Sequence, residues 1–187
     1  MQVVQAQVEQ HYRSEIVERI RANGHQIQAG DLTIRLAKEF GFCYGVERAI
    51  DLAYAARKSF PPDKPIYLLG EIIHNPHVNT KLREMGITFL KSGDHGFDYS
   101  AVTPADVVIL PAFGVTIADV ERLRGIGCIV VDTTCGSVLN VWKRVESYAR
   151  DGFTSLIHGK YYHEETRATA SQVNKYPGGT YLVVRNM

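Results

Sequence analysis

Two cysteines, Cys43 and Cys135, stand at turns where thiol chemistry is physically favourable. Residues 129–131 are apolar like a short buried strand, and residues 138–150 carry apolar side chains at helical spacing. Cys135 therefore falls between the carboxyl end of a strand and the amino end of a helix. The unpaired N–H groups of a helix's first turn stabilise negative charge, so this corner favours a thiolate. The alternative for a single cysteine is a small buried apolar residue.

The chain contains a second copy of this arrangement around Cys43. Residues 33–37 alternate like a strand, residues 41–45 form a glycine-flanked turn, and residues 46–58 have one apolar helical face. In α/β proteins, ligands collect at the carboxyl ends of strands. The sequence therefore predicts that Cys43 and Cys135 occupy equivalent corners and face a shared cavity.

Two histidines follow strands in the same way. His74 lies in the polar turn after an apolar run at 66–69, and His163 lies in the turn after a run at 155–157. Both imidazoles are candidates to bind an anion such as phosphate, and the alternative for each is a hydrogen bond to the backbone. Glu71 is placed to orient His74. Glu165 is either a proton donor or a solvated carboxylate.

Strands alternate with helices along most of the chain, which is typical of an α/β fold with a parallel, mostly buried sheet. A single amphipathic helix is predicted before them, within residues 1–24, because Tyr12, Ile16 and Ile20 are spaced by four. The later strands are predicted at 66–69, 87–90, 107–110, 128–131, 155–157 and 181–184, and the later helices at 46–58, 78–85, 117–124, 138–150 and 167–173.

Composition limits the possible partners. The net charge of +1 and the absence of a dense basic run give no reason to expect nucleic acid. No apolar run reaches the roughly 20 residues that span a bilayer, and no secretory signal is visible, so we expect no membrane partner. Three cysteines are few and odd in number. That favours a reducing compartment, the cytoplasm or an organelle of similar redox state.

The cysteine spacing discriminates between kinds of chemistry. Cys43 and Cys135 are too far apart in sequence for the paired ligands of a structural zinc site. A cysteine hydrolase would need a histidine beside one thiol, and two symmetric cysteines do not match that requirement. An iron–sulfur cluster fits better, although it needs a further thiolate. Cys128 opens a strand, and we expect it in the core.

Four motifs together resemble those of the 4-hydroxy-3-methylbut-2-enyl diphosphate reductases, the last enzymes of the methylerythritol phosphate route to isoprenoids. They are residues 41–50, 70–76, 132–135 and 158–166, in the same order and spacing, and the similarity runs from about Tyr12 to the C-terminus. The N-terminal helix and residues 111–114 are similar to the cyanobacterial and plastid branch. Phe113 stands where many members have histidine.

The resemblance implies a reductive dehydroxylation of an allylic diphosphate at a [4Fe-4S] cluster, with isopentenyl and dimethylallyl diphosphate as products. It implies that Cys43 and Cys135 are two of three cluster ligands, that His74 and His163 bind the diphosphate, and that Glu165 relays the proton. It also implies an electron donor such as ferredoxin or flavodoxin. The expected location is the cytoplasm, or the plastid stroma in a photosynthetic eukaryote.

The family fold is three α/β domains arranged like a trefoil around the cluster. By resemblance, residues 1–30 form an N-terminal helical extension, 31–43 a strand of the third domain, 44–135 the first domain and 136–187 a truncated second domain. The third domain and the third cysteine are expected beyond residue 187. We therefore expect the chain alone to be inactive. The alternative is a metal-free α/β fragment that binds a diphosphate without redox activity.

Overall fold

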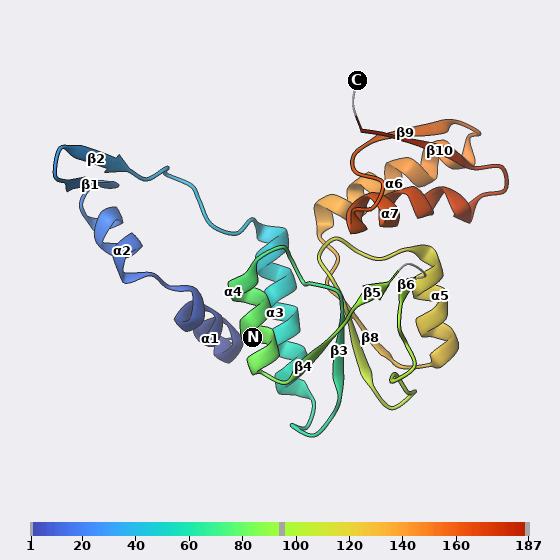
Figure 1. The fold of residues 1–187 in the computed structure, drawn as a ribbon, viewed down its shortest axis with the longest axis horizontal. Coiled ribbons are helices and arrows are strands. Elements are labelled where there is room, and N and C mark those ends of the chain that lie inside the picture. Colours follow the sequence, from blue (N-terminus) through green and yellow to red (C-terminus); the bar gives the residue numbers. More distant parts are fainter. Residues whose placement is uncertain (1, 94–95, 186–187) are drawn as a thin grey trace. The chain divides into compact units, whose positions relative to one another are not determined.

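The computed structural model describes residues 2–93 and 96–185 (Figure 1). The chain divides into two compact units, Met1–Cys43 and Tyr44–Met187. Within the second unit, the alternation of strands and helices predicted from the sequence is confirmed.

The first unit contains two helices and a hairpin. The helices are α1 (Gln2–Tyr12) and α2 (Glu15–Ala22), and the strands are β1 (Gln26–Ala29) and β2 (Leu32–Arg35). The prediction of one continuous helix is wrong because Ser14 begins a new one: its Oγ accepts a hydrogen bond from the Val17 N–H at 3.4 Å. The strand predicted at 33–37 is β2, but it pairs antiparallel with β1, which was not predicted. It therefore departs from the expected pattern of parallel pairing.

The second unit is organised around a parallel sheet with the strand order β4-β3-β7-β8. The sheet's elements, with its flanking helices, are β3 (Ile66–Leu69), β4 (Ile87–Leu90), β7 (Val107–Leu110), β8 (Ile129–Asp132), α3 (Tyr44–Ser59), α4 (Pro76–Glu84) and α5 (Ile117–Ile126). Helices α3 and α4 cover one face of the sheet and α5 covers the other (Figure 1). Helix α4 connects β3 to β4 toward one edge of the sheet, and α5 connects β7 to β8 toward the other edge. Because both connections are right-handed crossovers, the two helices lie on opposite faces.

The core lies against the two central strands. All four residues of β7 are buried. Its continuous apolar run predicted this, because a parallel strand covered on both faces has no solvent-exposed side. Large buried side chains from α3, α4 and α5 pack onto the sheet, among them Ile50, Tyr54, Leu82 and Leu123. The loop between β4 and β7 adds two short strands, β5 (Ser92–Gly93) and β6 (Gly96–Phe97).

The C-terminal part adds a smaller layer of helices and strands. It contains α6 (Gly136–Arg150), β9 (Thr154–His158), α7 (Glu164–Ser171), a 3₁₀ turn (Gln172–Lys175) and β10 (Thr180–Val184). The two strands pair in parallel. Helix α7 was expected from residue 167 and begins three residues earlier, since the side chain of His163 caps it. None of the helices in the described part of the chain is long and apolar enough to cross a membrane.

Candidate functional site: two imidazoles at the ends of strands

The turn that carries His74 is held by backbone hydrogen bonds. After β3, Gly70 adopts a φ of 71°, a conformation that favours glycine, and turns the chain toward α4. The Ala112 N–H donates to the Ile72 carbonyl at 3.0 Å, and the Nδ2 of buried Asn79 donates to the Ile73 carbonyl at 2.9 Å. The His74 side chain is left about half exposed, at 49%.

His163 lies at the amino end of α7 and reaches the same place. Its Nδ1 accepts a hydrogen bond from the Glu165 N–H at 3.3 Å, so the imidazole itself caps the helix. Its Nε2 lies 3.1 Å from the Nε2 of His74. The sequence predicted both histidines at strand exits, and the structure brings their rings into direct contact.

The hydrogen bonds assign a proton to one nitrogen of each ring. Because the Nδ1 of His163 accepts, a neutral His163 carries its proton on Nε2 and donates it to His74. The Nε2 of His74 then presents a lone pair, and its Nδ1–H donates to the Glu71 Oε2 at 3.1 Å. Glu71 therefore orients His74, as the sequence suggested.

Phe113 completes a cluster of three rings. It follows β7, and its ring stacks on His74 with a centroid distance of 4.5 Å and an interplanar angle of 27°. It also meets the edge of His163 at 5.8 Å. Phe113 therefore holds the His74 ring in place by stacking and supplies no hydrogen bond of its own.

The pair offers donors to an anion more readily than ligands to a metal ion. Potential ligand atoms of His74, His163 and Glu164 lie within 4.8 Å of one another. A metal would need the lone pair of the His163 Nε2, and that nitrogen carries the proton while Nδ1 accepts from the backbone. The Nε2–H instead points a donor into the site, which suits a phosphate oxygen.

Cys135 sits at a helix amino end, as predicted. It is the N-cap residue of α6, and its N–H donates to the Ala112 carbonyl at 2.9 Å. Its Sγ also lies against the first turn of α3, because a Cβ added to Gly45 would come within 2.2 Å of that sulfur. Two helix amino ends thus converge on one thiol, and the glycine makes the room for it.

An Asx turn fixes the approach to Cys135. The Asp132 Oδ1 accepts from the Thr134 N–H at 2.9 Å and from the Thr134 hydroxyl at 2.6 Å. The buried Thr133 hydroxyl donates to the Leu110 carbonyl on the neighbouring strand. In the sequence these residues stood out only as part of the motif at 132–135, whereas in the structure their side chains hold the cysteine in position.

The other predicted residues lie as follows. Cys43 is exposed and ends the first unit, so its position relative to Cys135 stays a prediction. Cys128 packs against the core as expected, and burial raises the pKa of its thiol. Glu165 lies in the first turn of α7 with an exposed side chain, and its role stays a prediction.

A packing contact that the sequence did not reveal joins α7 to the turn that follows β7. Trp142 on α6 covers Gly114, where an added Cβ would lie 2.3 Å from the indole. The indole N–H donates to the Thr169 hydroxyl on α7 at 3.1 Å. Trp142 therefore ties α7, which carries His163, to the turn of Phe113.

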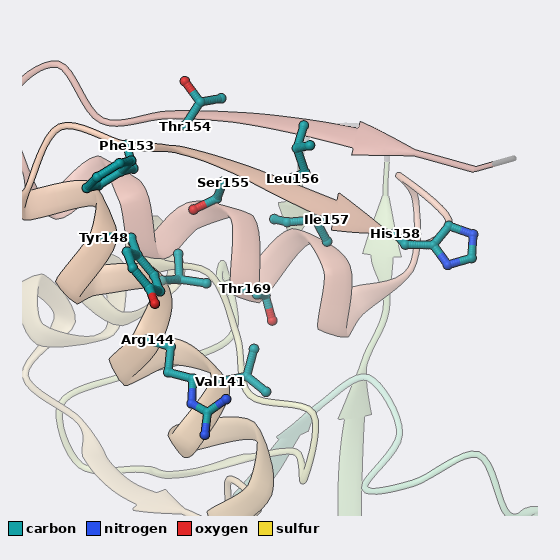
Figure 2. A pocket seen from close by; sticks show the side chains of 11 residues that line it. Val141, Arg144, Tyr148, Phe153, Thr154, Ser155, Leu156, Ile157, His158 and Thr169 are labelled. Atoms are coloured by element: carbon teal, nitrogen blue, oxygen red, sulfur yellow. The ribbon is translucent and has the colours of Figure 1, made fainter. Parts of the chain in front are cut away.

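A cavity of about 590 Å³ lies elsewhere, between α6 and β9. Figure 2 shows Val141 and Tyr148 of α6 facing Ser155 and Ile157 of β9 across it. Its lining includes neither of the paired histidines nor Cys135. Its size therefore says nothing about the chemistry of the histidine pair.

The fold and the site define an α/β protein with two histidines in contact at turns that follow its strands. The model of the LytB protein family matches residues 34–187. The chain belongs to the LytB family.

The relatives and solved structures agree with this assignment. The chain is 50% identical over 184 residues to the 4-hydroxy-3-methylbut-2-enyl diphosphate reductase of Thermosynechococcus vestitus, covering 98% of this chain and 44% of the relative. It is 49% identical over 176 residues to the reductase of the same name from Picosynechococcus, covering 94% of this chain and 42% of the relative. The chain therefore spans less than half the length of these relatives.

Two solved structures are similar in fold. One, described as (E)-4-hydroxy-3-methyl-but-2-enyl diphosphate reductase, gives a TM-score of 0.67 at 31% identity and covers 82% of this chain and 51% of that one. The other, described as E-1-hydroxy-2-methyl-but-2-enyl-4-diphosphate reductase from Plasmodium falciparum, gives 0.69 at 29% identity and covers 80% and 43%. The predicted fold class and the predicted family are both confirmed.

Proposed function

We propose that the chain is the N-terminal part of a 4-hydroxy-3-methylbut-2-enyl diphosphate reductase, an oxidoreductase of isoprenoid synthesis. In the reaction, two electrons and two protons enter, the C–O bond of the allylic alcohol breaks, water leaves, and isopentenyl or dimethylallyl diphosphate forms. The contact between His74 and His163 carries the proposal, because it places two imidazoles where a diphosphate can be held.

In this proposal the histidines bind the diphosphate end of the substrate. His163 donates from Nε2, and the amino end of α7 adds a favourable field for negative charge. Glu165, two residues further along the same turn, is the proposed proton donor to the leaving hydroxyl. Its backbone N–H already orients His163, so both groups move with one helix turn.

Cys43 and Cys135 are the proposed protein ligands of an iron–sulfur cluster. The space that Gly45 leaves beside the Cys135 sulfur, and the two helix amino ends there, suit an anionic thiolate ligand. Cys43 precedes Gly45 by two residues in the sequence. When bound, a [4Fe-4S] cluster supplies the electrons and a Lewis-acidic iron for the hydroxyl oxygen. The third cysteine is expected in a continuation of the chain.

The remaining partners follow from this chemistry. A one-electron carrier such as ferredoxin or flavodoxin is the proposed reductant, and the cytoplasm or the plastid stroma is the proposed location. A second candidate function is diphosphate binding without redox activity. It is favoured by one observation: the paired histidines both belong to the unit Tyr44–Met187, whereas Cys43 belongs to the other unit.

Calorimetric titration with dimethylallyl diphosphate tests the binding step. Loss of one charge-assisted hydrogen bond costs about 1.5–3 kcal/mol, so His74→Ala and His163→Ala should each weaken binding by roughly 10–100-fold. His25→Asn is the matched control, because His25 has a positive φ that Asn tolerates and belongs to the other unit. Equal affinity in the wild type and all three variants would refute the proposal that the histidine pair binds the diphosphate.

Iron and sulfide analysis after anaerobic reconstitution separates the two candidate functions. The reductase proposal predicts that the isolated chain holds iron weakly, that it gives no turnover, and that Cys135→Ser lowers the iron content further. If the chain only binds a diphosphate, Cys135→Ser should bind it as tightly as the wild type, and the iron content of the two proteins should be the same. A full, stable cluster with turnover in this chain would contradict the expectation that a third ligand is needed.

A further inference from the structure

We infer that Glu71 acts through His74 to couple diphosphate binding to the uptake of one proton from solvent. The inference rests on the proposed function of the histidine pair as a diphosphate site. Its basis is a chain of three hydrogen bonds, from the Glu165 N–H through His163 and His74 to the Glu71 carboxylate.

The free site can hold only one proton between the two facing nitrogens. The Nε2 atoms of His74 and His163 lie 3.1 Å apart, which is a hydrogen bond when one nitrogen donates and the other accepts. The backbone N–H of Glu165 assigns the donor role to His163. The Nε2 of His74 is then the acceptor in this contact, and its proton lies on Nδ1, which donates to Glu71.

A bound diphosphate reverses this requirement. Its oxygens offer only lone pairs, so both Nε2 atoms must carry protons in order to contact it. His163 already does, while His74 must gain a proton and become an imidazolium. That proton comes from solvent, and binding therefore weakens as pH rises, by about tenfold per pH unit where one proton is linked.

Glu71 is the residue that makes the charged form of His74 favourable. Its Oε2 lies 3.1 Å from the His74 Nδ1, so the hydrogen bond becomes an ion pair when the ring is protonated. The other titratable groups that face His74 among the described residues are His163 and Glu164, whose Oε2 lies 3.9 Å from the His74 Nε2. Phe113 stacks on the ring and holds it in place.

Glu71 and Glu164 lie beside different nitrogens of the His74 ring. Glu71 contacts the nitrogen that points away from the anion site, whereas Glu164 lies beside the nitrogen that points into it. Only Glu71 can stabilise the imidazolium without competing for the donor that the diphosphate uses. Glu71 is thus a positioning residue with an electrostatic role, since it acts through the His74 Nδ1.

The test is calorimetric titration of the full chain with dimethylallyl diphosphate at about pH 8, where a phosphate monoester is already deprotonated. Each titration is repeated in buffers of different ionisation enthalpy, and the dependence of the heat on the buffer gives the number of protons taken up. Glu71→Gln keeps an acceptor for the His74 Nδ1–H and removes only the charge. Glu121→Gln, at an exposed carboxylate on α5, is the matched control.

The wild type and Glu121→Gln are expected to take up about one proton per ligand. Glu71→Gln is expected to bind about tenfold more weakly and to shift the pH dependence of binding to lower pH. His74→Ala should bind weakly with no proton uptake. Tight binding without proton uptake in the wild type, or an affinity and pH dependence unchanged in Glu71→Gln, would overturn the inference and leave the anion site intact. Failure of the wild type to bind would overturn both this inference and the proposed diphosphate site.

Discussion

Replacing Gly45 with alanine is expected to destabilise the protein, although alanine is the better helix former. Gly45 is buried in the first turn of α3, where the substitution would ordinarily stabilise by about 0.5–1 kcal/mol. Here the new Cβ would lie 2.2 Å from the Cys135 Sγ and 3.2 Å from its Cβ. Overpacking of this kind costs about 1–3 kcal/mol, so the clash outweighs the helix propensity.

The net loss should be about 1–2 kcal/mol in the free energy of unfolding, measured by urea denaturation. For a chain of this size that corresponds to a fall in Tm of roughly 2–8 °C. Gly125→Ala is the matched control. Gly125 is exposed within α5, and a Cβ there would meet nothing within 4 Å. This control should stabilise by about 0.5–1 kcal/mol, the opposite sign.

A double-mutant cycle assigns the loss to the thiol. In a Cys135→Ala background the sulfur is gone, and the contacts at 3.2 Å to the Cβ and 3.8 Å to the Cα remain. Gly45→Ala should then cost about 1 kcal/mol less than in the wild type, which is a measurable coupling energy. A Gly45→Ala protein as stable as the wild type, or a coupling energy of zero, would refute the account of the thiol's surroundings.

Three further predictions concern other contacts of the site. Gly114→Ala should destabilise by more than about 2 kcal/mol in thermal or urea unfolding, because Gly114 has a φ of 73° and a Cβ there would lie 2.3 Å from Trp142; a neutral effect would contradict the packing described. Glu164→Gln should tighten dimethylallyl diphosphate binding by up to about fivefold in calorimetry. The Glu164 Oε2 lies 3.9 Å from the His74 Nε2 and competes with the ligand for that nitrogen, and an exposed pair of this kind is worth at most about 1 kcal/mol; weaker binding would argue against this reasoning. Cys128 should react with iodoacetamide more slowly than exposed Cys43 at neutral pH, because burial raises the pKa of the Cys128 thiol and so lowers its thiolate fraction. Mass spectrometry of the alkylated peptides measures the two rates, and the reverse order would contradict this prediction.

The parallel sheet was predictable from sequence for a simple reason. Each strand is a short apolar run followed by a turn, and this pattern sets the strand's place without knowledge of its neighbours. β7, for example, was predicted at its observed bounds, 107–110. The break between α1 and α2 was missed, although Ser14 followed by Glu15 is a recognisable helix start.

The site was predictable only in part. The positions of His74 and His163 at strand exits placed them at one edge of the fold, but their 3.1 Å contact depends on how α7 packs. That packing rests on Trp142, Gly114 and Thr169, which come from three separate elements. No local pattern in the sequence connects residues so far apart in the chain.

The central claim is that the two facing imidazoles form the anion site, and ¹⁵N NMR of the histidine side chains tests it most directly. In the free protein, His163 should carry its proton on Nε2 and His74 on Nδ1, as the hydrogen bonds require. Addition of dimethylallyl diphosphate should shift both rings together and leave His74 protonated on both nitrogens. Unchanged resonances of these two rings at saturating ligand would contradict the account.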